Sequence, residues 1–230
     1  MEEKQTEEIR NAWDQRQLLL GNNIRSVLCK GLPSWMNESI HRRHSQWIIK
    51  QFPMRGKRLL DVGCGYGRIS REIIKVYTEY VIEGVDSCDG FANEFEQEFS
   101  ACFHGSIQDY QPSDQFDVIL LITVLMYIKQ EQLPRMLEKL WNALSPGGRM
   151  ICIEPVDGNI TCVRHLLKNR VFSPTGDSNV SYFSGDRLKS LFFDLNGSHV
   201  VSQKAFGLFP WMTFPMLHYG LAIEKIVEQE

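Results

Sequence analysis

Two segments before residue 55 carry apolar side chains at helical spacing. The apolar positions in 6–20 and 33–51 recur every three or four residues, which predicts two amphipathic helices. The Gly31-Leu32-Pro33-Ser34 stretch separates them, since glycine and proline interrupt helices. The apolar stripes consist of Ile9, Trp13, Leu18 and Leu20 in the first helix, and of Trp35, Ile40, Trp47, Ile48 and Phe52 in the second.

The pattern changes at residue 58, where short apolar runs begin to alternate with amphipathic segments. In the run 118–122 no position is polar, which is typical of a strand buried on both faces in a parallel sheet covered by helices. The predicted strands are 58–62, 80–85, 101–105, 116–122 and 149–153, and the predicted helices between them are 67–76, 89–99 and 130–143.

The C-terminal segment has a different order, a helix followed by two strands. Ser184 is the predicted N-cap of a helix over 184–195. The strands 200–206 and 219–226 are joined by a connection too short for a crossover helix, so we expect them to pair antiparallel. The predicted fold class is therefore α/β: a doubly wound, Rossmann-like sheet of seven strands, mostly parallel, with an antiparallel C-terminal hairpin.

Composition and charge are those of an ordinary globular protein. Of the 230 residues, 43% are hydrophobic and 23% are charged, and no repeat or low-complexity tract divides the chain. One domain over residues 1–230 is therefore expected. The formal net charge of -3 argues against nucleic acid as a partner, because affinity for nucleic acid is mostly cationic.

Cysteine usage and the N-terminus predict a cytoplasmic protein. The six cysteines are spread singly, and no C-x-x-C or H-x-x-C pair gives metal-binding spacing, so we expect reduced thiols and no metal site. The N-terminal residues are acidic and polar, unlike a secretory signal, and no stretch approaches the ~18 apolar residues of a membrane span. A monomer or homodimer without membrane insertion is expected.

A glycine-rich loop follows the first predicted strand and precedes a predicted helix. It reads Leu59-Leu60-Asp61-Val62-Gly63-Cys64-Gly65-Tyr66-Gly67-Arg68. Glycines let the backbone turn tightly and let a ligand approach main-chain N–H groups without an intervening Cβ, and the helix N-terminus is aimed at that ligand. Taken alone, such a loop is also compatible with a simple strand-to-helix turn.

The spacing of the glycines distinguishes two classes of cofactor. A dinucleotide site has the pattern G-x-G-x-x-G, whereas this loop has G-x-G-x-G and places Arg68 where the third glycine belongs. Asp61 puts a carboxylate at the end of the strand, which repels a pyrophosphate and suits a ligand that carries an amino group and a sulfonium. The loop favours S-adenosylmethionine over NAD.

Residues 59–154 resemble the class I S-adenosylmethionine-dependent methyltransferase family, whose first motif reads close to Leu-Asp-Val-Gly-Cys-Gly-x-Gly. The resemblance implies a helical cap (1–55), a cofactor-binding core (56–155), a substrate insert (156–183) and a C-terminal helix and hairpin (184–230). It also implies that the loop holds the methionine end of the cofactor, while Arg68 either reaches the cofactor carboxylate or is a surface residue of the helix. The loop residues assigned in this way are Asp61, Gly63, Cys64, Gly65, Gly67 and Arg68.

The end of the second strand matches the family's ribose-binding position. Gly84-Val85-Asp86 ends that strand, and the resemblance implies that Asp86, with Ser87 beside it, accepts hydrogen bonds from the two ribose hydroxyls. The alternative is that Asp86 only caps the helix that begins near Asp89.

Two further segments of the family pattern surround the adenine and the reaction centre. The resemblance implies that Ile107 covers the adenine ring and that Gln108 or Asp109 bonds its exocyclic amine. Ile122 stands where many relatives have Asn, Ser or Gln, so we expect packing rather than a polar contact to hold the cofactor there.

Methyl transfer requires an aligned acceptor and often a base that takes its proton. The candidates are Glu154, which also suits a substrate-positioning role, Tyr127, which is alternatively a pocket wall, and His165 in the insert. The insert, the N-terminal helices and an aromatic lid are expected to select the acceptor, a small or medium molecule with an apolar face that is methylated on O or N. The aromatic residues of this lid, which could equally be core residues, are Phe206, Phe209, Trp211 and Phe214.

Three alternatives remain open from the sequence. Residues 65–70 and 107–110 locally resemble protein N-terminal amine methyltransferases, although that family has His in place of Tyr127 and an Asp-Asn pair in place of Glu154-Pro155. A catalytically silent protein that binds the cofactor and acts as a regulator would keep both Asp61 and Asp86. An NAD-dependent oxidoreductase is the third alternative.

Overall fold

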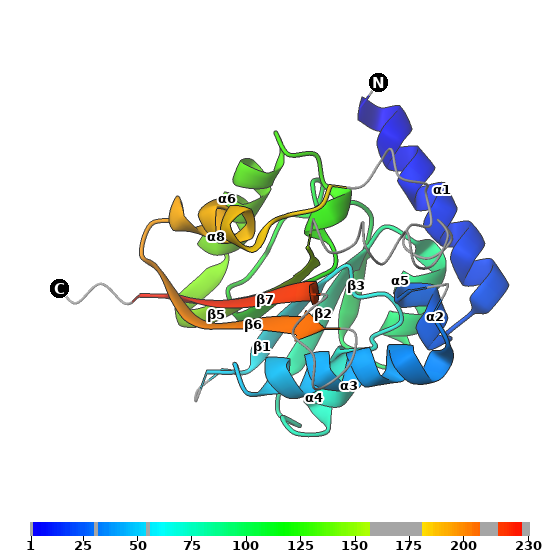
Figure 1. Ribbon diagram of the computed structural model, residues 1–230, viewed down its shortest axis with the longest axis horizontal. Helices are drawn as coiled ribbons and strands as arrows, with labels where there is room; N and C mark the ends of the chain where they lie inside the picture. Colours follow the sequence, from blue (N-terminus) through cyan, green and yellow to red (C-terminus); the bar gives the residue numbers. More distant parts are fainter. Residues whose placement is uncertain (1, 30–31, 54–55, 157–180, 208–215, 227–230) are drawn as a thin grey trace.

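The computed structural model describes residues 2–29, 32–53, 56–156, 181–207 and 216–226 (Figure 1). Its elements in chain order are α1 (Glu2–Leu20), α2 (Ile24–Val27), α3 (Ser34–Ile49), β1 (Arg58–Val62), α4 (Ser70–Ile74), β2 (Val81–Asp86), α5 (Asp89–Glu96), β3 (Ala101–His104), β4 (Phe116–Ile122), the 3-10 helix η1 (Leu125–Tyr127), α6 (Leu133–Asn142), β5 (Leu144–Pro155), α8 (Gly185–Phe193), β6 (Ser198–Gly207) and β7 (Met216–Lys225).

One seven-stranded sheet organises the chain, in the order β3-β2-β1-β4-β5-β7-β6. The five strands from β3 to β5 pair in parallel, while β7 pairs antiparallel with both β5 and β6. The predicted fold class and the antiparallel C-terminal hairpin are therefore confirmed. The strand order reverses direction between β1 and β4, and open α/β sheets bind ligands at the carboxyl edge of such a point.

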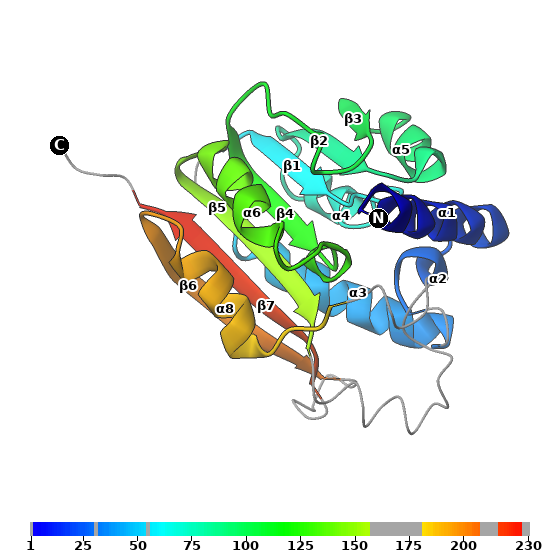
Figure 2. The ribbon, with the colours of Figure 1, turned by 90° about the horizontal axis from the view of Figure 1, so that it is seen from above.

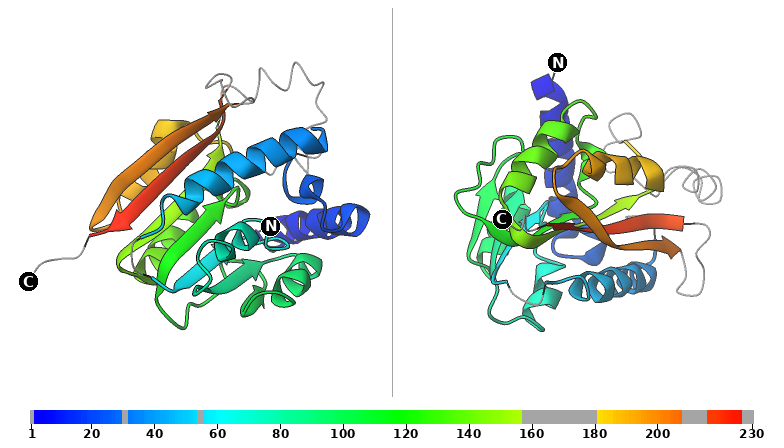
Figure 3. Two further views of the ribbon diagram at one scale, coloured as in Figure 1. Left: turned by 90° about the horizontal axis from the view of Figure 1, so that it is seen from below. Right: turned by 90° about the vertical axis from the view of Figure 1, so that its left-hand side faces the viewer.

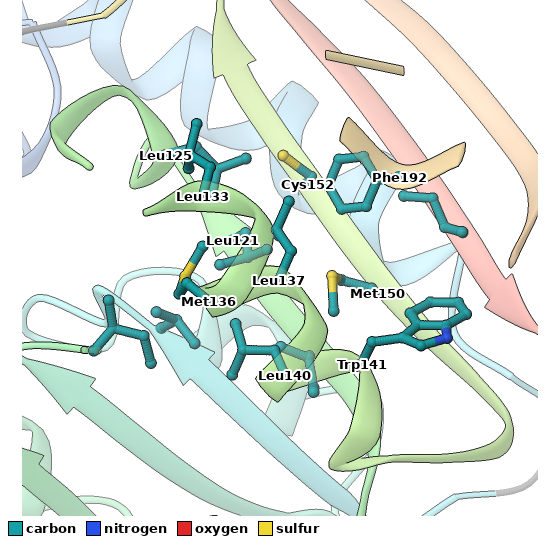
Figure 4. Packing of buried hydrophobic residues seen from close by; sticks show 14 of the residues in the cluster. Leu121, Leu125, Leu133, Met136, Leu137, Leu140, Trp141, Met150, Cys152 and Phe192 are labelled. Atoms are coloured by element: carbon teal, nitrogen blue, oxygen red, sulfur yellow. The ribbon is translucent and has the colours of Figure 1, made fainter. Parts of the chain in front are cut away.

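Alternate residues of β4 face two separate hydrophobic cores. Ile119 and Leu121 belong to the core under α6 and α8, and Val118 and Leu120 belong to the core on the opposite face. Figure 4 shows side chains of α6, such as Leu137, packed against the first face, and Figure 3 shows α3 lying along the second. Burial on both sides explains why the run 118–122 of this strand has no polar position.

Some elements differ from their predicted form. The helix predicted over 67–76 is only Ser70–Ile74, and the short helix α2 was not predicted. Leu18 and Trp35 were assigned to buried stripes but are 81% and 61% exposed. The predicted N-cap is confirmed, because the Ser184 side chain accepts a hydrogen bond from the Arg187 N–H at 3.1 Å.

Helices α1 and α2 lie beyond the carboxyl ends of the parallel strands (Figure 2). They bring the N-terminal segment next to α5 and α3. Of the described helices, none combines the length and the apolar character that a bilayer crossing requires. The described cysteines are all free thiols.

Candidate active site

A pocket opens at the carboxyl ends of β1, β2 and β4, at the point where the strand order reverses. Its walls come from the loops after these strands, from the segment after β3, and from Ile9 and Trp13 of α1 and Val27 of α2. Ten of the eleven residues predicted to bind a cofactor line it, and Gly67 does not: the ten are Asp61, Gly63, Cys64, Gly65, Arg68, Asp86, Ser87, Ile107, Gln108 and Ile122.

The glycines of the loop are required by backbone conformation and by close neighbours. Gly63 and Gly65 have φ of 67° and 55°, a region that residues with a Cβ rarely adopt. A Cβ added at Gly63 would lie 2.5 Å from Val124 Cγ2, and one added at Gly65 would lie 3.0 Å from Val27 Cγ1. Gly67 instead packs against the core, because a Cβ there would lie 2.5 Å from Phe99 Cε2.

The N–H groups at the start of this loop bond within the protein. Gly63 N–H donates to the Val85 carbonyl at 2.7 Å, Cys64 N–H donates to the same oxygen at 3.2 Å, and Gly65 N–H donates to Asp86 Oδ2 at 2.8 Å. Helix α4 begins only at Ser70 and has five residues. The expectation that these three N–H groups are free to bind a ligand is therefore wrong, because they join the loop to β2 instead.

Two buried carboxylates face the pocket. Asp61 accepts a hydrogen bond from Ser70 Oγ at 2.6 Å, and Asp86 accepts one from Gly65 N–H and one from Cys88 N–H at 2.9 Å. Burial raises the pKa of Asp61 and that of Asp86 to about 6, and the hydrogen bonds oppose this shift. Asp86 therefore holds the start of α5 and also lines the pocket, while its role in ribose binding stays a prediction.

These raised pKa values predict that a cation binds more weakly in acid. A cationic ligand favours the ionised carboxylates, so its affinity is expected to fall as the pH decreases through about 6. The loss is about tenfold per pH unit for one coupled proton. Calorimetric titration with S-adenosylmethionine between about pH 5 and pH 7 measures this dependence. S-adenosylhomocysteine keeps the amino group and the ribose hydroxyls assigned to these carboxylates, so it should show a similar dependence; an affinity for both nucleosides that does not change over this pH range would contradict the role of the carboxylates.

Arg68 is a buried cation at the edge of the pocket and not a surface residue. Only 8% of it is exposed, and its Nη1 lies 2.8 Å from His41 Nδ1 on α3. Burial lowers the pKa of His41 to about 4, so at neutral pH the imidazole is uncharged and Nδ1 can accept the hydrogen bond. Helix α3 thus orients Arg68, a contact that the sequence did not indicate.

The segment after β3 is held by one lysine of α6. Lys139 Nζ donates to the carbonyls of Ile107, Gln108 and Tyr110 at 2.8, 3.0 and 2.7 Å. The Gln108 side chain accepts a hydrogen bond from Ser106 Oγ and donates to Gln132 Oε1 at 3.4 Å. Ile107 and Gln108 both line the first pocket, and the bonds from Lys139 hold their backbone in place.

A second pocket adjoins the first. Trp13, Val27, Thr123 and Tyr127 line both. The second pocket extends between α1, α2, α3 and the end of β5, with walls that are largely apolar. Its remaining lining residues are Arg16, Leu28, Cys29, Leu32, Asn37, Ile40, Met126, Pro155, Tyr182 and His218.

Glu154 is wholly buried and lines neither pocket. Its Oε1 accepts hydrogen bonds from the N–H groups of Val124 and Leu125 at 2.8 Å each, and its Oε2 accepts one from Met126 N–H at 3.3 Å. Burial raises the pKa of this carboxyl to about 8 against the effect of these donors. The geometry favours positioning of the loop after β4 over proton removal from an acceptor.

Tyr127 and His165 are the other two predicted catalytic residues. The Tyr127 ring packs edge-on against Trp13, with ring centroids 5.6 Å apart, and burial raises the pKa of its hydroxyl. A phenol with a raised pKa is a poor base near neutral pH, whereas a wall or hydrogen-bonding role fits this position. His165 lies outside the described residues.

The predicted aromatic lid is only partly described. Phe206 is buried, packs against Trp47 and His44 on the α3 side of the sheet, and lines neither pocket, so its assignment to a lid is wrong. Phe209, Trp211 and Phe214 lie outside the described residues.

Comparisons with known proteins agree with the fold and with the loop. A family model described as a methyltransferase domain matches residues 36–203. Trans-aconitate 2-methyltransferase of Mycobacterium ulcerans is 25% identical over 113 residues, which cover 49% of this chain and 41% of that protein. Ubiquinone biosynthesis O-methyltransferase of Coxiella burnetii is 26% identical over 112 residues, which cover 46% of each. The chain thus spans less than half the length of these relatives.

A solved structure resembles nearly the whole chain. Magnesium protoporphyrin IX methyltransferase from Synechocystis with bound SAH (S-adenosylhomocysteine) superposes with a TM-score of 0.69 at 13% identity. The match covers 94% of this chain and 98% of that one. At this identity the likeness shows a shared fold.

Proposed function

The chain belongs to the S-adenosylmethionine-dependent methyltransferase family, and from this premise we propose that it transfers a methyl group from S-adenosylmethionine to an O or N atom of a small organic acceptor with an apolar face. The observation that carries the proposal is the pair of adjoining pockets at the carboxyl edge of the sheet, which share Trp13, Val27, Thr123 and Tyr127. The first has the residues for the cofactor, and the second has room and walls for an acceptor.

The first pocket fits the cofactor by charge and by shape. Asp86 has carboxylate oxygens at the place where ribose hydroxyls donate, and Asp61 supplies negative charge for the amino group. Arg68 offers a buried guanidinium for the cofactor carboxylate. The positive φ values at Gly63 and Gly65 keep that wall free of side chains. When bound, the cofactor supplies an electrophilic methyl group on a positively charged sulfur.

The acceptor is proposed to occupy the second pocket. Leu28, Leu32, Ile40 and Met126 give this pocket an apolar wall, which suits a molecule with a ring or an alkyl body. The names of the two curated relatives, which refer to trans-aconitate and to ubiquinone biosynthesis, also favour a small-molecule acceptor.

The loop after β4 aligns the two pockets. Thr123 has a φ of 59°, which is strained for a residue with a branched side chain, and its N–H donates to the Ile153 carbonyl at 2.7 Å. Glu154 binds the next three N–H groups of the same loop. We infer that Glu154 acts as a positioning residue: it holds Thr123 and Tyr127 where they separate cofactor and acceptor. The acceptor releases its proton, where it has one, to water.

Direct measurement tests this proposal. The protein is incubated with S-adenosylmethionine and a panel of phenols, organic acids and amines, and S-adenosylhomocysteine is quantified. Acceptor-dependent product supports methyl transfer. Heat of binding for both nucleosides without turnover on any acceptor, including peptides with a free N-terminal amine, would favour a binding-only regulator. Stabilisation by NAD and not by S-adenosylmethionine would overturn the cofactor assignment.

Removal of the Asp86 carboxylate should weaken cofactor binding. Asp86→Ala is expected to lower the affinity for S-adenosylhomocysteine by about 1–3 kcal/mol, because the ribose hydroxyls lose a charged acceptor. Asp117→Ala is the matched control. Asp117 Oδ2 also accepts two main-chain N–H groups, those of Lys57 and Arg58 at 2.7 and 3.0 Å, but at the opposite edge of the sheet. Calorimetry should find a comparable loss of stability in both variants and a loss of affinity only in Asp86→Ala; equal affinities would remove the ribose role.

A further inference from the structure

Arg16 is a buried cation that lines the second pocket. It lies on α1, and only 6% of it is exposed. Its Nη2 donates to the carbonyls of Arg25 at 2.6 Å and of Leu28. Its guanidinium carbon lies 5.0 Å from the centroid of the Trp13 ring, so the side chain is held from two directions. Arg16 is thus fixed in place at the wall of the pocket.

The charge of Arg16 has no counter-charge in the part of the chain that the structure describes. No described carboxylate forms an ion pair with it, and no Asp or Glu lines the second pocket. Both of its hydrogen bonds to described residues use Nη2, while Nε is buried and has no partner. Arginine remains protonated in proteins, and a buried cation without a counter-charge is costly. An anionic ligand in the pocket would supply the missing counter-charge.

The residues that line both pockets independently support an acidic acceptor, because they provide no base. Of the four that line both pockets, Trp13 and Val27 have no basic group, Thr123 has only a hydroxyl, and burial raises the pKa of Tyr127. Glu154, the other described residue predicted to be a base, binds three N–H groups of the chain. His218 also lines the second pocket, but burial lowers the pKa of its imidazole to about 3, which makes it a weak base. An acceptor that ionises by itself does not require a base in the protein.

We propose that the second pocket binds a small organic acid, with its carboxylate paired to Arg16 and its apolar body against Leu28, Leu32 and Met126. The inference rests on the proposed function, because it names the chemical class of the acceptor. The guanidinium is held at a fixed position by its bonds to the Arg25 and Leu28 carbonyls, and charge-assisted hydrogen bonds to an anion are stronger than those to a neutral group. The pocket should therefore distinguish an acid from a neutral molecule of the same shape.

Binding of matched acids and amides tests the proposal. The protein, saturated with S-adenosylhomocysteine, is titrated by calorimetry with cinnamate and octanoate and with their primary amides, cinnamamide and octanamide. We expect each acid to bind about tenfold more tightly than its amide. In Arg16→Met this preference should fall to less than about threefold, while the affinity for S-adenosylhomocysteine stays unchanged. Arg135→Met, which removes an exposed arginine of α6 and changes the net charge equally, should keep the full preference.

The outcomes separate this inference from the proposed function. Failure of the wild-type protein to bind S-adenosylhomocysteine would count against the proposed function itself. Normal binding of that nucleoside with no preference for acids over amides would overturn the role of Arg16, as would a preference that survives in a folded Arg16→Met protein. Where Arg16→Met does not fold, Arg16→Gln keeps an amide donor for the Leu28 carbonyl and removes the charge. If neither variant folds, the wild-type comparison of acids with amides decides.

Discussion

Replacement of Glu154 by alanine is expected to lower the free energy of unfolding by more than about 3 kcal/mol. The substitution leaves the buried N–H groups of Val124, Leu125 and Met126 without an acceptor, and each unsatisfied donor costs about 1–3 kcal/mol. For a chain of this size the midpoint of thermal unfolding should fall by about 6–12 °C. Differential scanning calorimetry measures the change.

A carboxylate on the adjacent strand β7 is the control for this result. Glu224 on β7 pairs with Arg149 at 2.7 Å, but about a third of its side chain is exposed, so Glu224→Ala should cost no more than about 1 kcal/mol. Similar losses in the two alanine variants would contradict the capping role of Glu154.

Glu154→Gln separates the two roles that the sequence allowed for this residue. Glutamine keeps one oxygen for the N–H groups of Val124 and Leu125 and resembles the protonated carboxyl that a raised pKa favours. A positioning residue should therefore tolerate the change, with a loss of about 1 kcal/mol in stability and turnover within about fivefold of wild type. A general base should not, and a loss of turnover beyond about a hundredfold at unchanged stability would return Glu154 to that role.

Gly63→Ala is expected to reduce cofactor affinity by about tenfold to a hundredfold. The new methyl group would lie 2.5 Å from Val124 Cγ2, well inside van der Waals contact, and Val124 lines the cofactor pocket. The positive φ adds strain for any residue with a Cβ. Because Val124 is also held through its N–H by Glu154, the loop cannot withdraw without breaking that hydrogen bond. Titration with S-adenosylhomocysteine measures the loss.

Gly21 provides a matched control for the backbone strain alone. Its φ of 56° is close to that of Gly63, and a Cβ added there would meet no atom within 4 Å. Gly21→Ala should therefore cost about 1 kcal/mol in stability and leave cofactor affinity within about twofold of wild type. Equal affinities for Gly63→Ala and Gly21→Ala would show that contact with Val124 does not shape the pocket.

Local patterns in the sequence predicted most of the fold. The strand predicted over 116–122 coincides with β4, and its run 118–122 has no polar position because both faces are buried. The short connection after 200–206 required an antiparallel hairpin. Ser184 predicted the start of α8, because an N-cap side chain bonds an N–H group only a few residues further along the chain. The sequence also indicated residues that line the first pocket, among them Gly63, Gly65 and Asp86. These residues lie at the ends of β1 and β2, and their positions follow from the local strand-to-loop pattern.

Only the tertiary structure decided which side chains meet across the fold. Periodicity assigned Leu18 and Trp35 to apolar stripes, but both side chains are exposed because no described element covers those positions. The sequence made Glu154 a candidate base, whereas in the structure its carboxylate accepts three N–H groups from the loop after β4. Likewise, Arg16 enters the second pocket because α1 crosses the carboxyl edge of the sheet (Figure 2). Hydrophobic periodicity predicts which face of each helix or strand is apolar. It does not predict which elements pack together, and contacts between residues distant in the chain depend on that packing.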